Sequence, residues 1–374
     1  MEDFLFFILI VISGLSFWNY NNRVYDWDMP GYIGCLYTLK FPDSPDKVRT
    51  FTYRSIKEDA PESHYKDILG VKPVDKARQV FASNTKAFSE QIPYFQIKLG
   101  YNLAILIMYE LGFSAAMSVS FLSIFSYFIS GFLIFLILKI IFPENYLLTS
   151  GITIGVMLLP PMTDMSRVAT PDMFIFQFLL VFMIGLLKKW NKWIMFLILF
   201  GITFTRPDYA PFTLSYLCAV LVFEYFKYKR IDFNIIIQGI VLFILYFSIM
   251  KLCHYPGWKN LFYDSFIFRR PIISAQPADF GLREYLDILY IKIIYFKRVT
   301  VISVGLLLGI FYLSKNWWIR ICAIFIFANV YVKFLFFPHS SGLRFFFGFI
   351  MCLLLLFLYV LSQKYNGFKL RKIA

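Results

Sequence analysis

Two carboxylates stand just after the first apolar segment of the chain, in the run 25–32, which reads YDWDMPGY. A carboxylate that is partly shielded from water can act as a general base, because desolvation raises its pKa. Two such groups can also bind a divalent cation through their oxygens. A turn closed by Pro30 and Gly31 would explain the same residues without chemistry. The position beside an apolar segment favours a catalytic role for Asp28 or Asp26.

Three further polar clusters interrupt the apolar sequence, at 166–172 (SRVATPD), 205–211 (TRPDYAP) and 338–345 (PHSSGLRF). A charge at the centre of a membrane span costs about 2.5–3.5 kcal/mol, so charges near spans tend to be paired or functional. Helix-end or turn pairing would account for Asp172 and for Arg206 with Asp208. The candidate residues of these clusters are Arg167, Asp172, Arg206, Asp208, His339 and Arg344.

A guanidinium group suits a phosphate because it can form two parallel hydrogen bonds to it. Arg344 is therefore a candidate ligand for a phosphate group. Lys297 and Arg298 are expected on the same side of the membrane and would extend a cationic patch, although contact with ordinary lipid headgroups would also explain them. A carboxylate base facing a cationic cleft at one membrane face predicts a substrate that is itself a membrane phosphate.

These residues require a scaffold, and the composition indicates which kind. The chain has 374 residues, of which 59% are hydrophobic and only 16% charged, whereas a soluble domain carries about 25% charged residues. The net charge of +14 comes from short Lys/Arg clusters between apolar segments, which is typical of membrane topology and argues against a nucleic-acid partner. The five cysteines and three histidines have no metal-binding or disulfide spacing.

The sequence predicts an all-α polytopic membrane protein with about ten transmembrane helices, arranged as one domain over residues 1–374. Short surface helices are expected in a first outer loop, 20–114, and a second outer loop covers 253–295. The run 99–112 is interpreted as an interfacial helix with Lys98 and Glu110 among headgroups; if it spans, the count is eleven. The expected spans are 4–19, 115–139, 146–163, 172–187, 192–205, 210–226, 234–252, 296–313, 320–337 and 343–362.

With these motifs in this order, the chain resembles the GT-C superfamily of polytopic glycosyltransferases. The stretch from Asp28 to Tyr32 resembles the acidic motif of that family's first outer loop, which has a Tyr four residues after the acid. The runs 166–172 and 205–208, and Arg344 with Phe345, are similar to later family signatures. The chain lacks a Glu after Asp28 and an Arg before Tyr32, so family contacts to the acceptor do not carry over at those positions.

The resemblance implies transfer of a monosaccharide from a polyprenyl-phosphate donor to a hydroxyl group of a glycan, lipid or protein acceptor, with inversion. Asp28 or Asp26 would act as base, Arg344 with Lys297 or Arg298 would hold the phosphate, and Arg206, Arg167 and His339 would contribute to donor binding. Asp172, Asp208 and Tyr32 would support the site. No cofactor is required, although Asp26 and Asp28 could hold a divalent cation. The expected location is a bacterial inner membrane, with the site facing the periplasm or the outside.

Two other functions fit parts of this pattern. A polymerase of lipid-linked polysaccharide repeat units would share the substrate type and the outer arginines, but usually has its largest outer loop late in the chain. A lipid or sugar transporter or flippase would need charged groups at mid-membrane depth, whereas the charges here lie at one edge.

Overall fold

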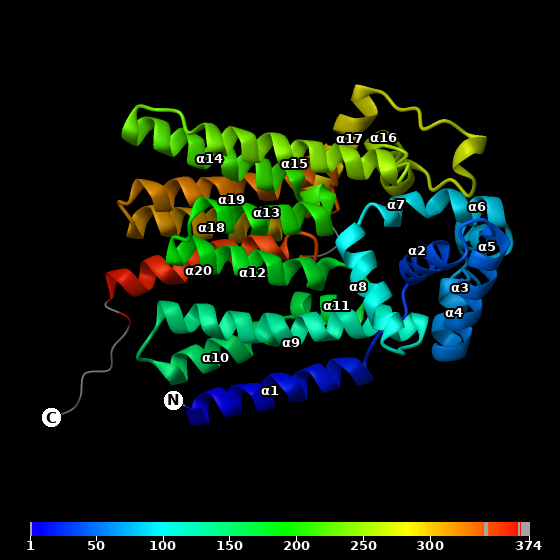
Figure 1. The fold of residues 1–374 in the computed structure, drawn as a ribbon, viewed down its shortest axis with the longest axis horizontal. Helices are drawn as coiled ribbons and strands as arrows, with labels where there is room; N and C mark the ends of the chain where they lie inside the picture. Colours follow the sequence, from blue (N-terminus) through cyan, green and yellow to red (C-terminus); the bar gives the residue numbers. More distant parts are fainter. Residues whose placement is uncertain (1, 340–342, 366, 368–374) are drawn as a thin grey trace.

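The computed structural model describes residues 2–339, 343–365 and 367, and in these residues the chain forms helices and loops without strands. One group of helices runs in a common direction (Figure 1). It consists of α1 (Glu2–Asn21), α9 (Ala115–Ile141), α10 (Tyr146–Met157), α12 (Asp172–Lys188), α13 (Lys192–Thr205), α14 (Ala210–Tyr228), α15 (Phe233–Leu252), α18 (Lys297–Leu313), α19 (Trp317–Phe336) and α20 (Phe347–Lys364).

A second group of shorter helices gathers at one end of this bundle (Figure 1). Its members from the first loop are α2 (Met29–Lys40), α3 (Pro45–Asp59), α4 (Glu62–Ile68), α5 (Lys76–Ser83), α6 (Thr85–Gln91), α7 (Pro93–Gln96) and α8 (Leu99–Glu110). Later segments at the same end are α11 (Pro160–Arg167), η1 (Pro207–Tyr209), α16 (Trp258–Phe262), η2 (Tyr263–Ile267), η3 (Ile273–Ala275) and α17 (Leu282–Tyr295). The expected short helices of the first loop are therefore present.

Apolar side chains hold each group together. In the bundle, α9, α12, α19 and α20 contribute most of a continuous core, because these helices are apolar on several faces and bury them against one another. In the end group, α2 packs closely on α6 and α7. A Cβ at Gly31 would lie 2.5 Å from the ring of Phe95, and one at Gly34 would lie 2.4 Å from Ile92. Because glycine has no side chain at these two positions, α2 can approach its neighbours this closely.

Five of the described helices are long and apolar enough to cross a membrane, and the number rises to seven if each of two bent helix pairs counts as one span. This fits an integral membrane protein, but the expected count of about ten is not confirmed. The run 146–163 does not form one straight span, because α10 and α11 meet at 57°. Proline at 160 and 161 explains the break, since proline cannot continue the hydrogen bonding of the preceding helix.

Two smaller differences from the sequence-based expectations concern the second outer loop and the start of the last helix. The expected second outer loop, 253–295, contains α17, a helix of 14 residues that meets α18 at 70°. The last span begins at Phe347 and not at 343. Helix α8 runs across the direction of the bundle helices (Figure 1), as expected for a helix that does not span. Its Glu110 forms an ion pair with Lys40 of α2.

Candidate active site

The loop between α1 and α2 brings Asp28 to the junction of the bundle and the end group. The backbone N–H of Val24 donates a hydrogen bond to the carbonyl of Arg167, 2.9 Å away, which ties this loop to the end of α11. Asp28 then occupies the N-cap position of α2, but its side chain makes no capping hydrogen bond. The carboxylate of Asp28 is consequently available to face the space beside it.

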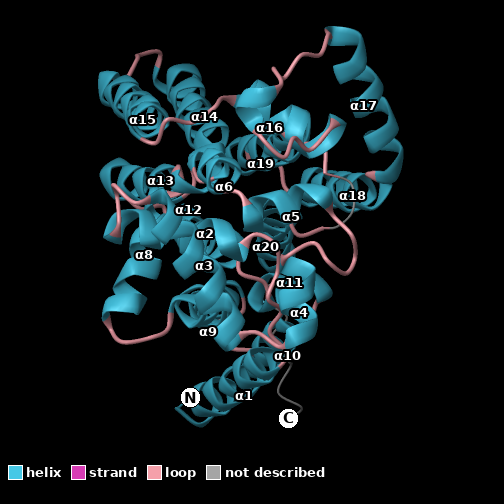
Figure 2. Ribbon diagram, turned by 90° about the vertical axis from the view of Figure 1, so that its right-hand side faces the viewer, coloured by secondary structure: helices cyan, strands magenta, loops and turns pink. Residues whose placement is uncertain are grey.

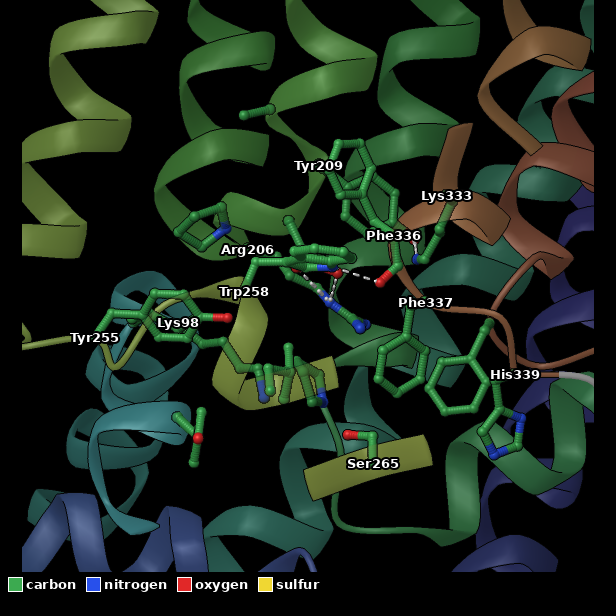
Figure 3. A pocket seen from close by; sticks show the side chains of 18 of the residues that line it. Lys98, Arg206, Tyr209, Tyr255, Trp258, Ser265, Lys333, Phe336, Phe337 and His339 are labelled. Carbon is green, nitrogen blue, oxygen red and sulfur yellow. Dashed lines mark hydrogen bonds and ion pairs between the residues drawn. The ribbon is translucent and has the colours of Figure 1, made fainter. Parts of the chain in front are cut away.

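That space is a cavity of about 870 Å³ between the bundle and the end group. Most of the residues singled out in the sequence lie on its wall, although they come from distant parts of the chain. These wall residues are Asp28, Tyr32, Asp172, Arg206, Asp208, His339 and Arg344. Figure 3 shows Arg206 and His339 around the cavity, together with Lys98 and Lys333. The structure thus brings together four sequence motifs that span more than three hundred residues.

One side of the wall is a network of paired charges. Arg206, which is 7% exposed, forms ion pairs with both Asp172 and Asp208. The Nε atom of Arg344 lies 3.1 Å from Oδ2 of Asp172, so this carboxylate is shared by two arginines. Thr170 donates a further hydrogen bond of 3.1 Å to the same carboxylate oxygen. The two arginines are thereby fixed at the ends of α13 and α20.

Three other cations on the wall have no carboxylate partner within ion-pair distance in the described part of the chain. The ammonium group of Lys98 donates to the hydroxyl of Tyr32 at 2.8 Å, and that of Lys333 donates to the hydroxyl of Tyr209 at 3.1 Å. The guanidinium of Arg269 lies 4.1 Å from the ring centre of Trp27, and its Nε atom is buried without a hydrogen-bond partner. These groups can bind an anion at little cost, because no internal ion pair has to break.

The sequence interpretation missed all three of these cations as site residues. Lys98 was expected among lipid headgroups, whereas it points into the cavity from the turn before α8. Lys333 interrupts the apolar run 320–337, and a charge inside such a run is itself a signal of function. Arg269 carries no comparable signal, because its place depends on how the second outer loop folds back.

The segment that carries Arg269 is fixed by a buried ion pair. Arg270, 2% exposed, binds the carboxylate of Asp264 through Nε at 2.7 Å and Nη2 at 2.9 Å. The hydroxyl of Tyr94 in α7 donates to the same carboxylate at 2.9 Å. Because Tyr94 belongs to the first loop, this cluster joins the first and second loops, and it places the neighbouring Arg269 at the cavity wall.

The two carboxylates of the first motif differ in their surroundings. Burial and the charge of Asp28 raise the pKa of Asp26 to about 8. Burial also raises the pKa of Asp28, but the charges of Lys98, Arg344 and Arg269 oppose the rise. Asp28 lines the cavity whereas Asp26 does not, and one oxygen of Asp26 is buried without a hydrogen-bond partner. Asp26 therefore holds its proton more tightly than an exposed aspartate does, and Asp28 is the carboxyl group that can meet a ligand.

Three of the expected phosphate ligands lie elsewhere. Arg167 is not part of the cavity wall, because its Nε donates to Asn19 at 2.9 Å and its guanidinium stacks on Trp18 at 4.1 Å. Lys297 and Arg298 are exposed at the start of α18 and do not line the cavity. Of the expected cationic patch of Lys297, Arg298 and Arg344, only Arg344 lines the cavity. The part 340–342 of the last motif lies outside the described residues.

Away from the charges, the cavity wall is apolar and reaches the outer surface of α15. Phe243 and Phe247 of α15 line the cavity and are 53% and 52% exposed. Val332 and Phe336 of α19 also line the cavity. The cavity consequently has a charged end beside Asp28 and an aromatic end beside an apolar helix surface.

The arrangement combines a carboxylate, unpaired cations and an apolar wall, so it can bind an amphiphilic anion and accept a proton beside it. Within the described residues, no group of three or more His, Cys, Asp or Glu side chains is placed to hold a metal ion. Comparison with known proteins finds no family model, no curated protein and no solved structure that matches the chain.

Proposed function

We propose that the protein is an integral membrane glycosyltransferase that moves a monosaccharide from a polyprenyl-phosphate donor to an acceptor hydroxyl, with the reaction at the outer face of the membrane. The observation that carries the proposal is the shared cavity. Asp28, the unpaired cations and the apolar wall of α15 all border one space of about 870 Å³. A lipid-linked sugar phosphate needs these three surfaces together, for its reacting sugar, its phosphate and its hydrocarbon chain.

The donor phosphate would lie among Lys98, Lys333 and Arg344. As the bond between the anomeric carbon and the phosphate oxygen breaks, negative charge builds on the departing phosphate, and fixed cations stabilise that charge more than they stabilise the bound donor. The lysines suit this role because neither is neutralised by a carboxylate among the described residues. The first isoprene units would lie against Phe243 and Phe247, where the cavity reaches the surface of α15.

Asp28 would take the proton from the acceptor hydroxyl as that oxygen attacks the anomeric carbon from the side opposite the phosphate. A single displacement of this kind inverts the configuration at the anomeric carbon. The raised pKa of Asp28 makes its carboxylate a stronger base than an exposed aspartate. Asp26 would remain protonated behind it, because its pKa is about 8.

The test is to incubate membranes containing the protein with a panel of polyprenyl-phosphate monosaccharides and to follow each donor by mass spectrometry. We expect one donor to be consumed by the wild type and the sugar to appear on an acceptor. Asp28→Asn should slow consumption by about 10²- to 10⁴-fold, the usual contribution of a general base, with the protein level unchanged.

Asp26→Asn is the matched control, because it makes the same chemical change two residues away and outside the cavity. It should consume the donor at a rate within a few-fold of the wild type. Consumption by Asp28→Asn at the wild-type rate would overturn the assignment of the base. If no donor in the panel is consumed, the glycosyltransferase proposal itself is contradicted, and a product that grows by several sugars at once would indicate a polymerase.

A further inference from the structure

Helix α17 has no buried residue over its whole length, although it is rich in leucine, isoleucine and tyrosine. Seven of its apolar side chains are strongly exposed, and four of them are Leu282 at 72%, Leu286 at 51%, Tyr290 at 70% and Ile293 at 47%. At 100° per residue these positions fall within a strip about 80° wide along the helix. Exposed apolar strips of this kind mark contact with another apolar phase.

The helix is attached to the rest of the molecule along the face next to this strip, which carries Tyr285 and Leu289. The hydroxyl of Tyr285 donates to the carbonyl of Leu335 in α19 at 2.9 Å, and its ring lies 5.8 Å from that of Trp258 in α16. Leu289 packs against the bundle core. The orientation of α17 is therefore fixed, and its apolar strip stays exposed beside the attached face.

The direction of α17 differs from that of the bundle. It meets α18 at 70°, and Figure 2, which looks along the length of the bundle, shows α17 lying lengthwise across the view at the edge of the molecule. If the bundle helices cross a membrane, a helix at this angle lies close to the membrane plane. It also lies at the bundle end that carries the cavity (Figure 1).

The corner at which α17 meets α18 is positively charged. Lys297 and Arg298 are both exposed, and no acidic side chain of the described residues pairs with them. They stand at the N-terminus of α18, where the helix dipole disfavours positive charge. Their position is explained if an external anion lies beside them, at the level where a membrane has its phosphate groups.

We propose that α17 lies in the plane of the membrane interface, with its strip of Leu282, Leu286, Tyr290 and Ile293 in the lipid and with Lys297 and Arg298 bound to the phosphates of anionic lipid headgroups. The charge of this corner favours a lipid surface over a second copy of the chain, which would bring the same positive charges together. Through Tyr285 and Trp258, the lipid surface would then support α16, whose Trp258 lines the cavity. This inference does not depend on the enzymatic proposal.

Depth measurements on α17 test the first half of the proposal. Spin labels are attached at Leu286→Cys and Ile293→Cys, in a Cys218→Ser background because Cys218 is the exposed cysteine of the described residues. The full chain is reconstituted in vesicles of phosphatidylcholine and phosphatidylglycerol. We expect oxygen, which partitions into lipid, to relax these labels more strongly than a water-soluble nickel complex.

The matched control positions are Asp287→Cys on the polar side of α17 and Lys57→Cys on the exposed side of α3, where the nickel complex should dominate. Strong relaxation of the labels at 286 and 293 by nickel would place the strip in water and overturn the proposal. Protection from both reagents would show that protein covers the strip, such as a second copy, and would overturn it equally.

Lipid selectivity tests the second half. A spin-labelled phosphatidylglycerol should bind the wild type more strongly than the corresponding phosphatidylcholine. The double variant Lys297→Gln/Arg298→Gln should lose about fivefold in that ratio for each charge removed. The control variant Lys47→Gln/Lys57→Gln removes two exposed charges from α3 and should keep the wild-type ratio. Unchanged selectivity in the first variant, or an equal loss in both, would contradict the role of the corner.

Discussion

The cavity wall has two regions that contain the same kinds of side chain and use them differently. Around Asp172, each arginine has a carboxylate: Arg206 has two, and Arg344 shares one. Elsewhere on the wall, Lys98 and Lys333 have only tyrosine hydroxyls as hydrogen-bond partners among the described residues. The first region satisfies its charges internally, whereas the second leaves positive charge facing an open space.

This difference separates structural charge from charge that is available to a ligand. An internally paired arginine contributes to stability chiefly because removing it would leave a buried carboxylate without a partner. A lysine that faces a cavity contributes little to stability, since a neutral residue of similar size can occupy its place. We therefore expect substitutions in the paired region to change folding, and substitutions in the unpaired region to change binding.

The largest expected effect is on stability. Arg206→Ala should lower the free energy of unfolding by about 3–5 kcal/mol, because it leaves Asp208 without its partner and Asp172 with only Arg344. Unfolding in mixed micelles with increasing denaturing detergent would measure the change. The matched control is Arg54→Ala, which breaks an exposed pair with Glu58 in α3 and should cost only about 0.3–0.5 kcal/mol. Equal losses in the two variants would remove the distinction between the regions.

A smaller effect is expected for the unpaired lysines, and it should appear in binding. Lys333→Gln should weaken binding of a polyprenyl phosphate by about 1.5–3 kcal/mol, the usual contribution of a hydrogen bond to a charged group, or roughly 10- to 100-fold. Stability should change by less than about 1 kcal/mol, since no ion pair is lost. The apparent affinity can be measured by titrating the lipid phosphate into protein in nanodiscs.

Lys98→Gln should weaken the same ligand by a similar factor, because Lys98 is also without a carboxylate partner among the described residues. A control with the same change is Lys86→Gln in α6, where the ammonium group lies 4.0 Å from Glu90 on the surface. If Lys333→Gln and Lys98→Gln bind as the wild type does, the two lysines do not form the phosphate site, and Arg344 and Arg269 remain as the candidates.

The sequence predicted one of these two regions far better than the other. Its motifs at 166–172 and 205–211 contain charges next to Pro, and such a combination at the end of an apolar run stands out locally. Asp172, Arg206 and Asp208 are candidates for that reason, and Arg344 is one because a guanidinium at the start of the last apolar run suits a phosphate. A pair of Arg206 with Asp208 is expected from the turn alone, but the contacts of Asp172 with Arg206 and Arg344 could not be predicted, because they depend on how α12, α13 and α20 pack.

The unpaired region was missed because its residues do not form motifs. Lys98 precedes an apolar helix and was interpreted as a headgroup contact, while Arg269 comes to the wall only through the buried pair of Arg270 with Asp264. The fold class followed from composition and apolar periodicity, which depend on local sequence. The break at 157–160 interrupts the expected span 146–163, because a count of apolar residues does not take into account the helix-breaking effect of Pro160 and Pro161.

The smallest expected effect concerns Asp26 and its pH dependence. Burial and the charge of Asp28 raise the pKa of Asp26 to about 8, so this side chain is neutral below that pH and becomes negative above it. The added negative charge would lie near Arg344 and should weaken phosphate binding by roughly 1 kcal/mol, or about fivefold, as expected for partly screened charges. Donor affinity in the wild type should therefore fall as pH rises from 7 to 9.

Asp26→Asn should bind the donor at pH 7 as the wild type does, because both carry a neutral side chain there, and should lose this fall in affinity at pH 9. Titrations of the same lipid phosphate into nanodiscs at both pH values provide the measurement. Any other group that titrates in this range affects both proteins and cancels in their ratio. A ratio that stays at one from pH 7 to 9 would show that Asp26 does not become charged in this range, whereas a constant ratio different from one would show that Asp26 is already ionised at pH 7.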